Sequence, residues 1–363
     1  MLKKIHLDLG RNSYNIYIDT GIIKKAGRYI KNLCSNDSVA VITNRKIYSV
    51  CGSGLTRSLA ASGLKYKVFT VPDAETSKSL KEVERLNTAI TRSFTARHPV
   101  VVALGGGVVG DLAGFVASIC KRGLPLIQIP TTLLAQLDSS IGGKVGIDTS
   151  SGKNLMGAFY QPKAVLIDPD VIRSLPPRQI RCGLAEAIKC AVITDNGLFA
   201  YIGRYHKKLL NASPASLGYV VKKCAAIKAS IVERDEFDKL GIRAKLNFGH
   251  TIGHAIESAA SYKRYLHGEA ISIGMLSAAD IAVEMGLFKG GERDRLEKLI
   301  RDVGLPVKIK GIRLDSILCS VSYDKKFSDG RSRFILPVSI GRVRLVDNVA
   351  AALIKKVVAY RMA

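Results

Sequence analysis

The sequence predicts an α/β domain followed by a mostly α-helical domain, divided near residue 176. Apolar strand-like runs alternate with helical patterns in the first half, and this alternation is typical of a parallel sheet covered by helices. After Leu175-Pro-Pro177, long stretches of helical periodicity follow. Because prolines interrupt regular structure, we place the boundary there and expect domains at 1–176 and 177–363.

The elements of each half follow from the spacing of apolar residues. Buried strands are predicted at 38–43, 66–71, 99–104 and 125–130. Leu80, Val83, Leu86 and Ile90 recur at helical spacing and predict one buried helix face over 79–92. Further helical stretches are predicted at 185–193, 217–233 and 271–285.

Composition favours a reduced, cytoplasmic protein. The seven cysteines form no C-x-x-C pair, and the first residues lack the apolar segment of a secretory signal. The most apolar window, 100–120, contains Asp111 and five glycines. A buried strand, loop and helix therefore explain this window better than a membrane span does.

The net charge of +25 raises the question of a nucleic-acid partner. Lysines and arginines are dispersed along the chain, no basic run carries interleaved aromatic residues, and there is no tryptophan. We therefore expect no specific nucleic-acid binding. The charge is explained either by a generally basic surface or by the attraction of anionic substrates into a cleft.

A glycine-rich turn follows the third predicted strand. The segment Gly105-Gly-Gly-Val-Val-Gly-Asp111 matches G-x-G-x-x-G, a pattern that lets backbone N–H groups approach a phosphate. The acidic residue expected about 20 positions later in dinucleotide-binding proteins is absent, because 126–129 is apolar. A phosphate-binding turn and a purely structural turn both stay open on the spacing alone.

Polar loops and one charged pair supply further candidates. Thr131, Thr132, Asp138, Lys144 and Lys153 lie in loops rich in Gly, Ser, Thr and Asn, which favours a ligand-lined region over solvated lysines. Glu186 and Lys189 lie three positions apart within a predicted helix. Most pairs at this spacing are surface ion pairs, and this alternative remains.

Three of the six histidines lie close together in the second half. His250 and His254 are at positions i and i+4, and His267 and Glu269 follow shortly after. Since Thr251 occupies the glutamate position of H-E-x-x-H, the protease motif is excluded. The spacing favours a metal site over two hydrogen-bonded helix histidines, and three nitrogen or oxygen ligands suit catalytic zinc.

These motifs, taken in order, resemble the dehydroquinate synthase family, whose members catalyse the second step of the shikimate pathway towards chorismate and the aromatic amino acids. The resemblance runs from about residue 39 to about 341. It is carried by the segments 105–112, 128–134, 138–144, 152–154, 157–162, 183–189, 247–254 and 267–269. It implies a Rossmann-like NAD-binding α/β domain, a mostly helical metal-binding domain, and a site in the cleft.

The resemblance also implies roles for individual residues. The metal, Zn²⁺ or Co²⁺, would be held by Glu186, His250 and His267, while His254 would face the substrate instead. The residues expected to contact NAD are Asn44, Asp73, Glu75, Lys78, Gly107, Val108, Val109, Gly110, Asp111, Thr131, Thr132, Lys144, Lys153, Val171, Ile172, Arg173 and Ser174. The residues expected at the substrate are Arg122, Asp138, Lys144, Asn154, Lys189, Lys228, Arg243, Asn247, His254 and either Lys325 or Lys326.

Arg122 reaches a neighbouring subunit's site in the family, which implies a homodimer. Ala74 replaces a usual glycine, Ser174 replaces a usual threonine, and Lys245 replaces a usual leucine. The segment between Lys228 and Arg243 is one residue longer than in some members. None of these departures removes a chemical role.

The implied enzyme is a carbon–oxygen lyase that converts 3-deoxy-D-arabino-heptulosonate 7-phosphate to 3-dehydroquinate and phosphate. Transient oxidation by NAD, phosphate elimination, reduction and an intramolecular aldol step make up the family's reaction. Cyclases of the same superfamily act on substrates without a carboxylate, which Lys228, Arg243 and Asn247 argue against. Polyol dehydrogenases related to glycerol dehydrogenase would not need Arg122, Lys144, Asn154 and Lys228 together.

Overall fold

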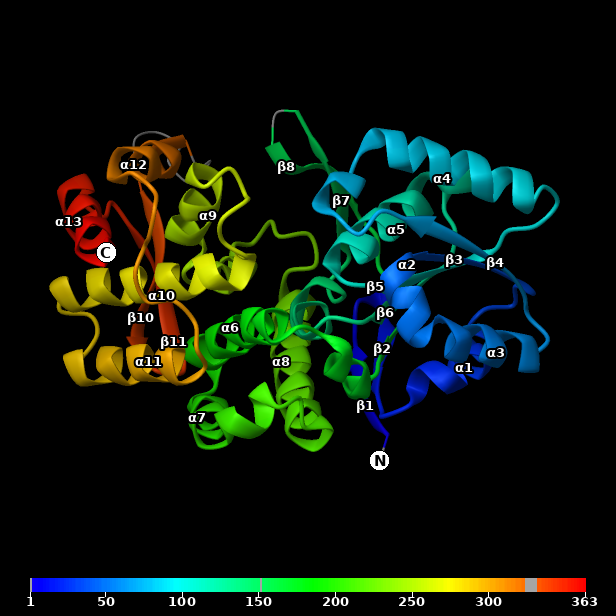
Figure 1. Ribbon diagram of the computed structural model, residues 1–363, viewed down its shortest axis with the longest axis horizontal. Helices are drawn as coiled ribbons and strands as arrows, with labels where there is room; N and C mark the ends of the chain where they lie inside the picture. Colours follow the sequence, from blue (N-terminus) through cyan, green and yellow to red (C-terminus); the bar gives the residue numbers. More distant parts are fainter. Residues whose placement is uncertain (1, 151, 324–331) are drawn as a thin grey trace. The chain divides into compact units, whose positions relative to one another are not determined.

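The computed structural model describes residues 2–150, 152–323 and 332–363 (Figure 1). The chain forms two compact units, one made of 1–176 with 217–237 and one made of 177–216 with 238–363. The expected division into 1–176 and 177–363 therefore fails at 217–237. This segment is helical, as predicted, but helical spacing shows only that a helix has an apolar face, not which core covers it.

A twisted sheet forms the centre of the first unit. Over the described residues it has seven strands, in the order β1-β2-β9-β6-β5-β3-β4, parallel except between β1 and β2. The strands are β1 (Lys3–Leu7), β2 (Tyr14–Ile18), β3 (Ser38–Asn44), β4 (Lys65–Val71), β5 (Val100–Gly105), β6 (Leu126–Pro130) and β9 (Ala164–Ile167). All four strands predicted from apolar runs are confirmed as β3 to β6.

Helices cover both faces of this sheet, as a parallel sheet requires. Figure 1 shows α1 and α3 on one face and α4 and α5 on the other. The helices of this unit are α1 (Ala26–Leu33), α2 (Arg45–Ile47), α3 (Ser53–Ala61), α4 (Leu80–Ser93), α5 (Gly107–Ile119) and most of α8 (Pro214–Arg234). A hairpin of β7 (Lys144–Thr149) and β8 (Gly152–Phe159) stands apart from the sheet.

The predicted face of α4 is confirmed except at its first residue. Val83, Leu86 and Ile90 are buried in the core under the sheet. Leu80, the first residue of the helix, is 57% exposed and does not belong to the buried face. Ser79 caps this helix by accepting a hydrogen bond from the Glu82 N–H, which defines where α4 begins.

The order of strands creates a switch point between β3 and β5. The chain leaves β3 towards β4 at one edge, whereas β5 leads to β6 on the other side. Ligands of open α/β sheets bind outside the carboxyl ends of the strands at such a point. Asn44 ends β3 and Gly105 ends β5, so a ligand-binding crevice is expected between the two loops that follow them.

The second unit is mainly helical. Its helices are α6 (Pro177–Thr194), α7 (Asn196–Leu210), α9 (His250–Ala259), α10 (His267–Glu284), α11 (Gly290–Asp302), α12 (Leu314–Tyr323) and α13 (Ala351–Arg361). A hairpin of β10 (Arg333–Ser339) and β11 (Arg342–Asp347) packs with them. The predicted helices at 185–193 and 271–285 are confirmed within α6 and α10, both buried on nearly all sides. No helix of the described residues is long and apolar enough to cross a membrane.

Two glycines of α10 let it approach its neighbours at backbone contact. A Cβ on Gly268 would lie 2.2 Å from the Cys182 carbonyl oxygen of α6. A Cβ on Gly274 would lie 2.0 Å from the Gly249 carbonyl oxygen, just before α9. Both separations are below any real Cβ contact, so the crossings of α10 with α6 and α9 require glycine at these positions.

We predict that Gly274→Ala lowers the free energy of unfolding by about 1–3 kcal/mol, the usual cost of overpacking a core. The methyl group meets backbone atoms, which cannot rotate away as a side chain could. Gly291→Ala is the matched control, because nothing lies within 4 Å of its Cβ and it sits in α11. Urea unfolding of both variants checks this. Equal stability of the two variants would contradict the packing argument.

Candidate functional site

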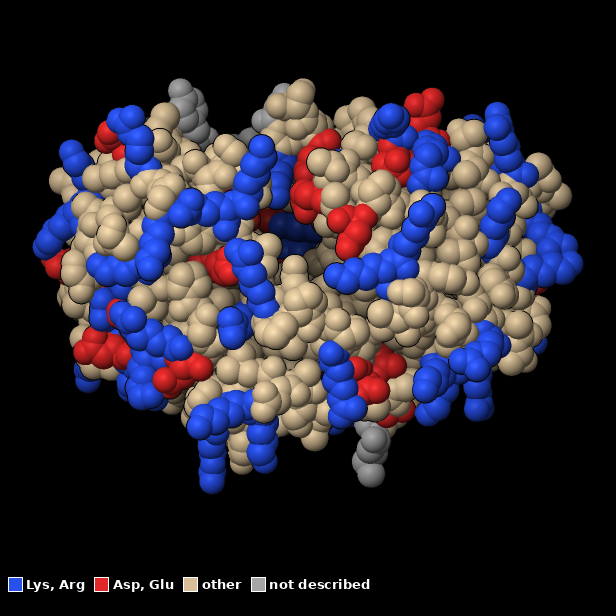
Figure 2. Space-filling model, viewed as in Figure 1, with Lys and Arg blue, Asp and Glu red and all other residues tan. Residues whose placement is uncertain are grey.

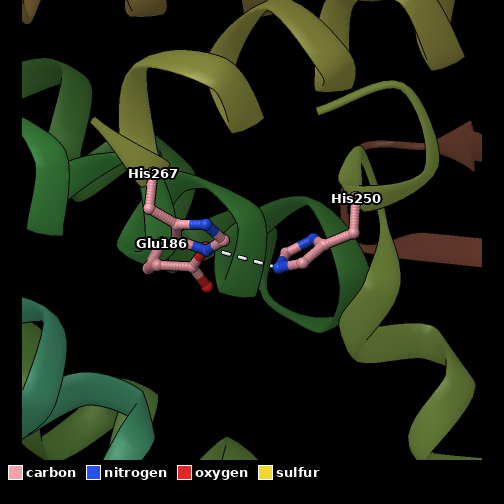
Figure 3. Close-up of side chains that lie close together, drawn as sticks. All are labelled: Glu186, His250 and His267. Atoms are coloured by element: carbon pink, nitrogen blue, oxygen red, sulfur yellow. Dashed lines mark ion pairs between the residues drawn. The ribbon is translucent and has the colours of Figure 1, made fainter. Parts of the chain in front are cut away.

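Three side chains from three helices of the second unit converge on one point. Glu186 comes from α6, His250 begins α9 and His267 begins α10. One ligand atom from each lies within 4.8 Å of the others. The Nε2 atoms of His250 and His267 lie 3.7 and 3.5 Å from Glu186 Oε1, and both rings point towards the carboxylate (Figure 3).

The Glu186 carboxylate is buried and ionised. Its side chain is 1% exposed, and neither oxygen accepts a hydrogen bond from the described residues. Although burial raises its pKa, the Lys189 ammonium group and the two imidazoles hold that pKa well below the usual range. Lys189, itself 2% exposed, forms an ion pair with it. The expected surface pair of Glu186 and Lys189 is therefore a buried one.

The two histidines differ in charge. Burial and the nearby Lys189 lower the pKa of His250 well below its usual value, so its ring is neutral. Burial also opposes charge on His267, but Glu186 and Glu257 raise its pKa to about 10. A positive charge is thus favoured between these carboxylates, and a divalent cation would supply one. One oxygen and two nitrogen donors are also the set that catalytic zinc uses.

The structure groups His250 with Glu186 and His267 as possible metal ligands, and not with His254, which helix spacing had paired with it. His254 is exposed and does not belong to the group that contains Glu186. It joins a second group with Glu257 and His267. Glu269 does not join either group. It forms a two-bond ion pair with Arg178, at 2.7 Å for both bonds, and accepts from the Leu266 N–H, so it fixes the start of α10.

A second cluster lies in the first unit and joins residues expected at the nucleotide and at the substrate. Lys78 is 4% exposed, and its Nζ lies 2.8 Å from Asp111 Oδ2 and bonds to Asn154 Oδ1. Lys153 lies 3.5 Å from Glu75. Burial raises the pKa of Asp111 to about 6, although Lys78 opposes the shift. The Lys78 ammonium group and the Asp111 carboxylate therefore lie together near the N-terminal half of α5.

Asn154 adopts a left-handed backbone, with φ of 54°, and its N–H donates to Asp148 Oδ1 at 2.9 Å. Such a conformation is uncommon outside glycine and is often kept at functional sites. Asp148 also donates its N–H to the Lys78 carbonyl oxygen at 2.9 Å. Asp148, which was not among the residues expected at the site, therefore contacts both Lys78 and Asn154.

The glycine turn begins α5 at the switch point. A Cβ on Gly106 would lie 2.9 Å from Thr132 Cγ2, so this glycine has the structural role that the sequence left open. No side chain caps the helix N-terminus at Gly106, which leaves N–H groups for an anion. Thr131 is fully buried, and its hydroxyl has no hydrogen bond within the described part of the chain. The uncapped start of the helix suits a bound phosphate.

The other residues expected to contact NAD differ from one another in burial and in hydrogen-bond partners. Asn44 accepts from the Ile47 N–H at 2.8 Å and donates to Asp73 at 2.8 Å, so these two meet at the crevice. Val109 is buried in the core, which leaves only its backbone for a ligand. The side chains of the turn Pro169–Ser174 interact within the turn. Ser174 Oγ donates a hydrogen bond to the Val171 carbonyl oxygen at 2.7 Å, and Arg173 forms an ion pair with Asp170 at 3.3 Å.

Lys228 and Asp138, both expected at the substrate, form an ion pair with each other. Lys228 Nζ lies 2.5 Å from Asp138 Oδ1 and 2.7 Å from its carbonyl oxygen. The pair brings α8 onto the first unit. Lys144 is exposed at the start of β7.

Arg122 projects from a strained turn after α5. It has a φ of 64°, and the preceding Lys121 has a φ of 48°. Two such residues in succession cost energy that other contacts must offset. Lys121 Nζ supplies them by donating to the carbonyl oxygens of Phe94, Thr95 and Arg97 at 2.5, 3.1 and 2.7 Å.

The remaining substrate candidates lie in the second unit. Arg243, 4% exposed, and Asn247 belong to the 3₁₀ turn Ile242–Asn247 that leads to His250. Lys325 and Lys326 lie outside the described residues. Glu257 is the residue that sequence reasoning missed in this unit. It lies one and two helical turns after His254 and His250, so helix spacing could have found it.

Comparison with known proteins finds family models and relatives that match this chain. The model of the 3-dehydroquinate synthase N-terminal region matches residues 68–182, and that of the C-terminal region matches 183–327. A 3-dehydroquinate synthase of Desulforamulus reducens is 44% identical over 349 residues, which cover 96% of this chain and 97% of that protein.

Two solved structures are similar over nearly the whole chain. A 2-deoxy-scyllo-inosose synthase with carbaglucose-6-phosphate, NAD⁺ and Co²⁺ is 27% identical, with a TM-score of 0.89 and coverage of 99% of this chain and 100% of that one. A 2-epi-5-epi-valiolone synthase of Streptomyces hygroscopicus with NAD⁺ and Zn²⁺ is 25% identical, with a TM-score of 0.87 and 96% of both chains covered. With the relative at 44% identity and matching models for both halves, this chain belongs to the 3-dehydroquinate synthase family.

Proposed function

We propose that this chain converts 3-deoxy-D-arabino-heptulosonate 7-phosphate to 3-dehydroquinate and phosphate in the shikimate pathway, with NAD and Zn²⁺ or Co²⁺. The donor set of Glu186, His250 and His267 carries the proposal, because one oxygen and two nitrogen ligands converge there on residues that the family resemblance implies as metal ligands. The relatives with bound NAD⁺ and Zn²⁺ or Co²⁺ support the same cofactors here. Bound there, the metal would polarise a hydroxyl group of the substrate, and NAD would exchange a hydride with the carbon that carries it.

The protein's own residues would bind and orient an anionic substrate. Lys228, Arg243 and Asn247 suit the carboxylate, and Lys144, Arg122 and Asn154 suit the phosphate end. The helix N-terminus at Gly107, with Thr131 and Thr132, would hold the NAD pyrophosphate. Lys78 and Asp111 would hold the neighbouring loops in position around the nucleotide.

The nucleic-acid alternative gains no support from the face of the molecule that Figure 2 shows. Figure 2 shows Lys and Arg side chains spread over the visible face with Asp and Glu among them, not gathered in one stripe. Sequence-specific binding needs a concentrated basic footprint. The cyclase relatives remain the closer alternative, and substrate choice decides between them.

We also propose a cytoplasmic homodimer. The seven cysteines are all free, as expected in a reducing compartment. Leu155, Met156 and Phe159 of β8 are 47%, 37% and 40% exposed, an apolar strand that a second copy could cover. The strained turn that presents Arg122 would then serve the neighbouring subunit. Measurement of the molecular mass in solution tests the dimer.

Phosphate release from the heptulosonate phosphate tests the function, and chelation tests the metal. We expect exhaustive chelation to abolish activity and Zn²⁺ or Co²⁺ to restore it. Glu186→Gln should weaken metal binding by more than about 100-fold, since even groups that only orient a ligand contribute about 10- to 100-fold. Glu284→Gln, at the far end of α10, is the control. Full activity of chelated enzyme would refute the metal assignment.

Arg243→Ala should lower kcat/KM by about 2–5 kcal/mol of transition-state stabilisation, because a buried cation would be lost from a substrate carboxylate. Steady-state kinetics measure the loss. Arg313→Ala, 85% exposed in the same unit, should change little. Unaltered turnover by Arg243→Ala would reopen the choice between this enzyme and the cyclases whose substrates lack a carboxylate.

NAD should be required for phosphate release, yet NADH should not accumulate, because the hydride returns to the substrate within each cycle. Absorbance of NADH followed during turnover checks this. A polyol dehydrogenase would instead produce NADH in step with substrate consumption. Such a steady rise would replace the cyclase assignment with the dehydrogenase one.

A further inference from the structure

His267 is held between two carboxylates, one at each ring nitrogen. Its Nε2 lies 3.5 Å from Glu186 Oε1, and its Nδ1 lies 3.2 Å from Glu257 Oε2. Glu257 comes from α9 and its side chain is 9% exposed. Glu257 therefore contacts the side of the ring that faces away from the donor set.

The two histidines of the donor set are oriented by different means. His250 donates Nδ1–H to the Phe248 carbonyl oxygen at 3.1 Å, a contact fixed by the backbone two residues earlier. His267 is the first residue of α10, and its side chain is 33% exposed against 10% for His250. Its orientation therefore depends on a side chain from another helix.

We propose that Glu257 is a positioning residue for metal binding. Its carboxylate accepts the Nδ1–H of His267, keeps the proton on Nδ1, and leaves the Nε2 lone pair facing Glu186 and His250. A neutral imidazole carries one N–H, and a partner on one nitrogen determines which nitrogen can bind a metal. Carboxylates in this position also make the ring a stronger ligand. The inference rests on the proposed metal-dependent function.

A second cation site is the alternative explanation of the same contacts. His254, Glu257 and His267 form a group of possible ligands. Because His267 belongs to both groups, two ions would require its ring to bind through both nitrogens after losing both protons. A hydrogen bond to Glu257 needs no such loss. We therefore favour the positioning role, and metal stoichiometry separates the two.

The test measures metal affinity of the full-length protein after removal of bound metal. Zn²⁺ binding is followed by competition with a chromogenic chelator, and the geometry of the site by the absorption bands of bound Co²⁺. We expect Glu257→Met, which has similar volume but no charge and no oxygen acceptor, to bind Zn²⁺ about 10- to 100-fold more weakly. Glu257→Gln should recover part of the affinity, since its amide oxygen accepts the same bond.

Glu284→Ala is the matched control, because it removes a carboxylate from α10 that pairs only at the surface with Lys356. It should bind Zn²⁺ like the parent protein. Measuring the unfolding of each metal-free variant distinguishes a loss of metal affinity from a loss of the fold. If Glu257→Met does not fold, Glu257→Ala is used for the same measurement.

Two results would overturn the inference. One is Zn²⁺ affinity of Glu257→Met or Glu257→Ala equal to that of the parent. The other is two ions bound per parent chain and one per variant, which would assign Glu257 to a second cation site. Failure of the parent chain to bind any Zn²⁺ or Co²⁺ would instead refute the proposed function.

Discussion

Glu186 carries a negative charge among the helices of the second unit, where an isolated ion would cost several kcal/mol. Lys189 on the next turn of α6 offsets part of that cost, and the imidazoles of α9 and α10 face the same carboxylate. Three helices are thus arranged around one charge. The arrangement favours a cation at its centre, and this explains why so costly a group is kept in the core.

Close helix packing makes this convergence possible. Gly268 and Gly274 let α10 touch the backbones of α6 and of the turn before α9, so that His267 reaches a carboxylate from another helix. The orientation of the rings comes from hydrogen bonds at their far nitrogens, from the Phe248 carbonyl oxygen for one and from Glu257 for the other. Packing sets the distance between the ligands, and hydrogen bonds set their direction.

The electrostatic requirement in the first unit is different, because there an anion would bind at the edge of the sheet. The switch point between β3 and β5 opens the crevice, and α5 presents N–H groups there. Lys78 is kept charged and buried by Asp111 and Asn154, while Asp148 holds the strained loop.

The sequence by itself determined the strands of the sheet, the main helices and the class of enzyme, because apolar periodicity and ordered motifs are local. The resemblance to a known family identified Glu186 as a metal ligand, whereas helix spacing alone paired His250 with His254. Only the tertiary structure decided that α8 joins the first unit, that Leu80 is exposed, and that Glu257 contacts His267. Each of these three findings depends on which surfaces pack together. Contacts between segments that are distant in the chain produce no periodic pattern in the sequence, so the sequence alone does not predict them.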